Sequence, residues 1–131
     1  MADFLLDSDV VIWHLRGHLT IANCVFTLAR RGRIGLSAIT RAEVLQGMRE
    51  PESKATFGFL DACETLPVAV ETADRAGEIV RSFRSQGVTI GLPDALIGAT
   101  ALLAGLPLYT CNPRHYPMEG LDLRALSLSR G

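Results

Sequence analysis

The sequence predicts an α/β fold with a mainly parallel central sheet of four to five strands and helices on both faces. Short apolar runs typical of buried strands alternate along the chain with longer stretches of helical periodicity. One of these longer stretches, residues 93–104, is almost wholly apolar, as expected of a helix packed between two layers. A chain of 131 residues can build one domain with a hydrophobic core but not two, so we expect a single domain over residues 1–131.

In the first half of the chain, an apolar run ends abruptly in carboxylates and is typical of a buried strand. An apolar stripe with a 3.6-residue period then ends in Arg30-Arg31-Gly32, where cations and a glycine commonly terminate a helix. The expected elements are a strand at 3–7, a helix through Val11 and Leu15, a helix at 18–31, a strand at 33–36, a helix at 37–47 and a helical segment from residue 50.

In the second half, Pro67 is expected at the start of a strand, where its missing N–H matters least. An amphipathic stretch stopped by Gly87 predicts a helix, and Gly105 ends the apolar helix that follows. The expected elements are a strand at 66–70, a helix at 72–86, a buried helix at 93–104, a strand at 106–110, a loop at 112–120 and an edge strand at 121–123.

Composition limits the classes of function. The formal net charge is −1, so binding of a polyanion would need a local basic patch or a metal ion. Cys24, Cys63 and Cys111 are widely spaced without a CxxC motif, which favours a reducing compartment, and we expect a cytoplasmic protein. We find no signal peptide, and the longest apolar stretch, residues 95–106, is too short to cross a bilayer, so no membrane association is expected.

Three acids recur at equivalent places. Asp7 follows the first predicted strand, Glu43 lies early in the helix after the second, and Asp94 opens the buried helix. Strand carboxyl ends and helix N-termini share one edge of a parallel sheet, so these acids could converge there. Converging carboxylates repel each other unless a cation is present, and Mg²⁺ or Mn²⁺ prefers such oxygen ligands. Such an ion can activate water and stabilise charge on a phosphoryl group.

Each acid also has a purely structural interpretation. Asp7 suits a helix cap, Thr40 and Glu43 match the spacing of a capping box, and Asp94 would interact favourably with a helix dipole. These interpretations do not exclude a metal site. Asp94 is the most informative of the three, because a lone charge that opens an apolar helix is costly to bury without a partner or a metal.

Four segments carry a recognisable combination of motifs, namely residues 5–10, 36–47, 92–99 and 108–112. They resemble the PIN domain, and specifically the VapC-type toxins of bacterial toxin–antitoxin pairs. Together, in this order and at this spacing, they extend the resemblance over essentially the whole chain. The resemblance implies a metal-dependent ribonuclease that hydrolyses a phosphodiester with metal-activated water. It also implies an RNA substrate, a cognate antitoxin protein that blocks the acidic site, and a homodimer.

The resemblance assigns the metal ligands to Asp7, Asp94 and Glu43, with Mg²⁺ or Mn²⁺ as the ion, and Glu43 could instead position the water. Many members have a fourth acid just after the last core strand. This chain has Asn112 there, which puts a second metal in doubt, although its carbonyl oxygen could still ligate or orient a water. For Asp9 two alternatives stay open, a further ligand or a side chain that points away from the helix start.

Two other classes of function remain open at this stage. The segment 7–10 resembles the opening motif of haloacid-dehalogenase-type phosphatases, but these need a lysine near the site, and the only lysine is Lys54 in a predicted helix. A catalytically weak PIN-like module that binds RNA or protein is supported by Asn112 and opposed by the three retained acids. Tyr116, in the loop after Asn112, is a candidate for stacking on bases, whereas core or dimer packing is favoured for Trp13.

Overall fold

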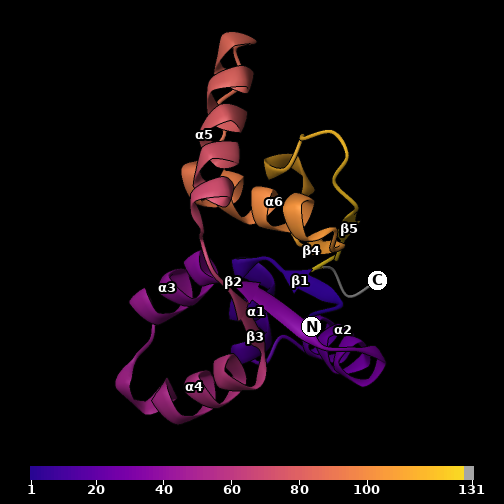
Figure 1. Cartoon of the computed structure of the whole chain (residues 1–131). Coiled ribbons are helices and arrows are strands. Elements are labelled where there is room, and N and C mark those ends of the chain that lie inside the picture. The colour runs from indigo at the N-terminus through magenta and orange to yellow at the C-terminus, as the bar shows by residue number, and fades with distance from the viewer. Residues whose placement is uncertain (129–131) are drawn as a thin grey trace.

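The computed structural model describes residues 1–128, which form one α/β domain around a single five-stranded sheet (Figure 1). The strand order is β3-β2-β1-β4-β5, and every neighbouring pair is parallel. The strands are β1 (Phe4–Leu6), β2 (Ile34–Ser37), β3 (Glu64–Leu66), β4 (Leu108–Thr110) and β5 (Leu123–Ala125). The α-helices are α1 (Ser8–Leu15), α2 (Leu19–Arg31), α3 (Ala38–Gln46), α4 (Ser53–Ala62), α5 (Val70–Ser85) and α6 (Leu92–Ala104), and short 3₁₀ turns lie at Glu50–Glu52 and Pro113–His115.

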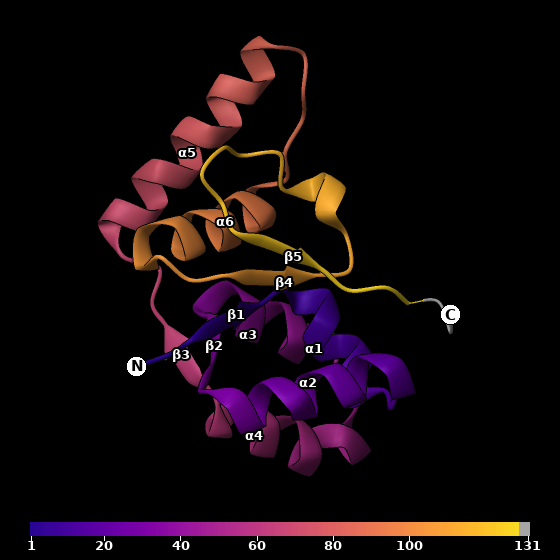
Figure 2. The same ribbon diagram turned by 90° about the vertical axis from the view of Figure 1, so that its right-hand side faces the viewer.

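The sheet separates two apolar cores, because helices cover both of its faces as the sequence predicted. Successive residues of β1 point to opposite faces, so Leu5 enters one core and Leu6 the other, and both are fully buried. Helices α5 and α6 lie on one side of the sheet and α1, α2 and α4 on the other (Figure 2). The predicted buried helix is confirmed, because α6 lies between the sheet and α5 and buries six residues in a row broken only at Leu96.

Two strand predictions were displaced. The third strand is Glu64–Leu66 and not 66–70, because it ends immediately before Pro67, and Val70 already begins α5. Because it is an edge strand, it needs little apolar surface, and its polar residues gave no strand signal in the sequence. The last strand does lie at an edge, but it is Leu123–Ala125 and not 121–123.

The topology places a crevice at the carboxyl ends of the central strands. Strand β1 lies between β2 and β4; the chain leaves β1 through α1 and α2 on one face and enters β4 from α6 on the other. Such a switch point opens a crevice at the carboxyl ends of the strands. Asp7, Ser37 and Thr110 lie at these ends, and all three side chains are buried. Within residues 1–128, every helix is too short or too polar to span a bilayer.

Candidate active site

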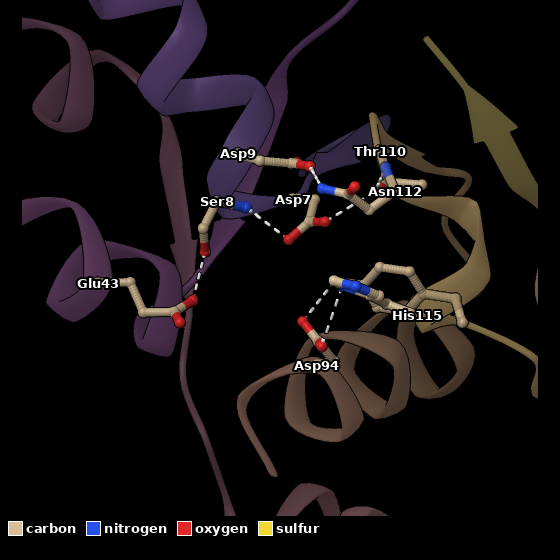
Figure 3. Close-up of polar contacts among 9 residues, drawn as sticks. Asp7, Ser8, Asp9, Glu43, Asp94, Thr110, Asn112 and His115 are labelled. Atoms are coloured by element: carbon tan, nitrogen blue, oxygen red, sulfur yellow. Dashed lines mark hydrogen bonds and ion pairs between the residues drawn. The ribbon is translucent and has the colours of Figure 1, made fainter. Parts of the chain in front are cut away.

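Asp7 is the fixed centre of the site (Figure 3). It follows β1 and caps α1, and its Oδ1 accepts a hydrogen bond from the backbone N–H of Ser8 at 2.7 Å. Its Oδ2 accepts a hydrogen bond from the hydroxyl of Thr110 at 2.7 Å. The side chain is only 4% exposed, yet each oxygen keeps a further lone pair. The cap interpretation is therefore correct, and it leaves Asp7 able to bind a cation as well.

Glu43 is attached to this centre through Ser8. The Ser8 hydroxyl lies 2.6 Å from Glu43 Oε1 and 3.1 Å from the hydroxyl of Thr40. Because an ionised carboxylate only accepts hydrogen bonds, Ser8 donates to Glu43. The capping-box interpretation of Thr40 and Glu43 is wrong, since Ser37 caps α3 with its hydroxyl and Thr40 is buried one turn further on.

Asp94 lies in the first turn of α6, opposite the other acids (Figure 3). The hydroxyl of Tyr116 donates to its Oδ1 at 3.4 Å, and His115 Nδ1 lies 3.4 Å from its Oδ2. Burial raises the pKa of Asp94, the negative charges of Asp7 and Glu43 raise it further, and His115 opposes them. The carboxylates thus share one electrostatic environment although they come from different elements of the fold.

Asn112 occupies the loop after β4 and links to the same centre. Its backbone N–H donates to the Thr110 hydroxyl at 2.9 Å, and its side-chain amide donates to Asp9 Oδ2. Burial raises the pKa of Asp9 to about 7, and the neighbouring charge of Asp7 contributes. Asp9 Oδ1 is itself buried without a hydrogen-bond partner in the described residues.

The donor set fits a hard divalent cation. All of the converging side chains offer oxygen, and carboxylate oxygens are the ligands that Mg²⁺ and Mn²⁺ prefer. In the described part of the chain, no three His, Cys, Asp or Glu side chains surround one point closely enough to hold an ion by themselves. Mg²⁺ usually keeps several of its waters and needs few direct protein ligands, so this spacing is compatible with it. Asp9 Oδ1, which has no hydrogen-bond partner in the described residues, is a further oxygen that could bind such a cation.

The structure thus brings together Asp7, Glu43, Asp94 and Asn112, the four residues selected from the sequence. It also adds Thr110, which sequence reasoning missed because a threonine at a strand end has no distinctive pattern, and Thr40, which the sequence suggested only as a helix cap. Tyr116 does not suit base stacking as predicted: it is 3% exposed and packs against Gly98 of α6. A glycine in an otherwise apolar helix was the available signal for such close packing.

The fold and the site together define an α/β protein with an acidic, oxygen-donor centre at the carboxyl edge of its sheet. Residues 4–121 match the family model described as PIN domain. Ribonuclease VapC10 of Mycobacterium tuberculosis is 37% identical over 114 residues, covering 87% of this chain and 86% of that protein. Ribonuclease VapC19 of the same species is 36% identical over 115 residues, covering 87% and 92%. The chain belongs to the PIN domain family and, within it, to the VapC ribonucleases.

Solved structures show the same fold. DNA-bound VapBC from Salmonella typhimurium superposes with a TM-score of 0.81 at 23% identity, covering 98% of this chain and all of the other. VapBC2 from Rickettsia felis, bound to a promoter DNA fragment, has a TM-score of 0.78 at 20% identity, covering 93% and 97%. The family match excludes the phosphatase alternative. The lysine that such a phosphatase needs near its site is also missing there, because Lys54 is an exposed residue of α4.

Proposed function

We propose that this protein is a divalent-metal-dependent ribonuclease, the toxin of a toxin–antitoxin pair, with its site at Asp7, Glu43, Asp94 and Asn112. The observation that carries the proposal is the convergence of three carboxylates on one sheet edge, from the residue after β1, from α3 and from α6. The relatives named Ribonuclease VapC support the substrate class, and the VapBC structures support an antitoxin partner.

In this proposal Asp7 and Asp94 hold Mg²⁺ or Mn²⁺, and Glu43 either joins them or orients the attacking water. The cation would lower the pKa of water and stabilise the charge that develops on the phosphoryl group. Ser8 and Thr110 fix the carboxylates in advance, which reduces the reorganisation needed during reaction. Tyr116 and His115 hold Asp94 on the opposite side of the site.

The antitoxin and the cellular setting are part of the same proposal. An arginine or lysine of the antitoxin would pair with the acidic centre and block it. We also propose a homodimer and a cytoplasmic location. All three cysteines are free, which suits a reducing compartment.

Cleavage of a mixed structured and unstructured RNA pool tests the proposal. Antitoxin-free wild type is compared with Asp94→Asn and with Asp74→Asn, a matched change of charge on the exposed face of α5. We expect cutting with Mg²⁺ or Mn²⁺, none in EDTA and none with Asp94→Asn, whereas Asp74→Asn should cut like wild type. A folded wild type that cuts nothing with either metal would refute a general ribonuclease.

A second candidate is a module that binds RNA without cutting it, favoured by the uncharged Asn112 beside Asp9. The same samples separate the two. RNA binding without cleavage by wild type, unchanged in Asp94→Asn, would indicate the binding module.

A further inference from the structure

Asp9 is the acid of this region that the proposed function leaves without a role. It lies in the first turn of α1, two residues after Asp7. The side-chain amide of Asn112 donates to its Oδ2. Its Oδ1 is buried and accepts no hydrogen bond in the described residues. Buried polar atoms nearly always have a partner, so an exception calls for an explanation such as a bound ion.

The position of Asp9 is fixed relative to Asp7 by a chain of hydrogen bonds. Asp9 is held by the side chain of Asn112, whose backbone N–H donates to Thr110 Oγ1, and Thr110 donates to Asp7 Oδ2. Figure 3 shows these four residues gathered on one side of the site, with Asp94 facing them. A carboxylate that only interacted with the dipole of α1 would need none of these hydrogen bonds.

We propose that Asp9 supplies a carboxylate to the cation of this site and that Asn112 is the positioning residue that holds it there. This inference rests on the proposed function, because it takes the metal centre as given. The loop after β4 then contributes an amide that orients a charge, and the charge itself comes from α1. Asp9 Oδ1 is the oxygen left free for the ion.

Titration calorimetry with Mn²⁺ alone, without RNA, tests the inference. Asp9→Asn keeps the shape of the side chain and removes its charge, and we expect Mn²⁺ to bind about tenfold more weakly or worse. Asn112→Ala removes only the positioning contact, so it should weaken binding less. Asp74→Asn is the matched control on α5 and should bind like wild type.

The exchange variant Asp9→Asn with Asn112→Asp is the decisive arm. Because the two side chains are in direct contact, it returns a carboxylate to nearly the same place. We expect Mn²⁺ affinity to recover toward wild type. Unchanged affinity in Asp9→Asn, or no recovery in the exchange variant, would overturn the role of Asp9 as a ligand and leave it a structural part of α1.

Two further comparisons keep the outcomes separate. Circular dichroism establishes whether each variant is folded. If Asp9→Asn does not fold, Asn112→Ala serves as the test instead, because Asn112 is exposed. Unchanged Mn²⁺ affinity in Asn112→Ala would then contradict the inference. Asp94→Asn tests the metal centre itself. Equal Mn²⁺ binding by wild type and Asp94→Asn refutes the proposed function, whereas loss in Asp94→Asn with wild-type binding by Asp9→Asn refutes only the role of Asp9.

Discussion

Replacement of Thr110 by valine should destabilise the protein more than its small change in shape suggests. The Thr110 side chain is fully buried, donates to Asp7 Oδ2 at 2.7 Å and accepts from the N–H of Asn112 at 2.9 Å. Loss of the bond to the charged carboxylate costs about 1.5–3 kcal/mol, and loss of the second about 0.5–1.5 kcal/mol. We therefore expect the free energy of unfolding to fall by about 2–4.5 kcal/mol.

Urea unfolding of metal-free protein measures this effect. Thr110→Ser keeps the hydroxyl and should lose only about 1 kcal/mol for the missing methyl group. Thr100→Val is a matched control, because Thr100 is also buried but makes one uncharged bond, to the carbonyl of Leu96 at 2.8 Å. If Thr110→Val were no less stable than Thr100→Val, the hydrogen bond from Thr110 to Asp7 would not make the expected contribution to the free energy of unfolding.

Three other substitutions test other parts of the structure. Ser8→Ala removes the 2.6 Å hydrogen bond to Glu43 and should lower the free energy of unfolding by about 1–2 kcal/mol. It should also slow RNA cleavage. Glu43→Gln is the comparison variant in both the unfolding and the cleavage assay. Gly35→Ala places a Cβ 2.7 Å from Ala2 Cβ and 3.2 Å from the carbonyl oxygen of Phe4, and it should cost about 1–3 kcal/mol, measured by urea unfolding. A neutral result would mean that the backbone beside β2 moves aside easily. Burial lowers the pKa of His14, so the folded state binds fewer protons than the unfolded state, and the stability from neutral His14 is complete above about pH 6.5 and lost as the pH falls. The melting temperature should therefore drop more between pH 7.5 and 5.5 in wild type than in His14→Phe, and equal drops would refute this.

Most elements could be predicted because their signals are local. Apolar runs, helical periodicity and glycine stops lie within a few residues of the boundary that they define, and the parallel sheet follows from their alternation. The predicted position of the third strand was wrong because Glu64 and Thr65 are polar. An edge strand has a neighbouring strand on one side only and does not require an apolar sequence. Pro67 marked the end of that strand and not its start.

The acids of the site could be predicted for the same reason, since each follows a recognisable strand or opens a recognisable helix. Their supports could not. The alignment of Leu6 with Tyr109 in the sheet is what brings Thr110 opposite Asp7, and such a register is a property of two distant segments. The burial of Tyr116 likewise depends on its packing against α6, a helix that is distant from the loop in the order of elements, and Gly98 was only a weak local signal of it.

The hydrogen bond between Asp7 and Thr110 joins residues 103 positions apart and has a consequence for the timing of folding. Contacts between such distant segments form late, because a long loop must close first. Strand β4 must dock beside β1 before Asp7, Asp94 and Asn112 can share one site. A partly synthesised chain that lacks β4 would have acids but no assembled centre. Catalytic competence would then arise only after β4 has joined the sheet, late in the synthesis of the chain.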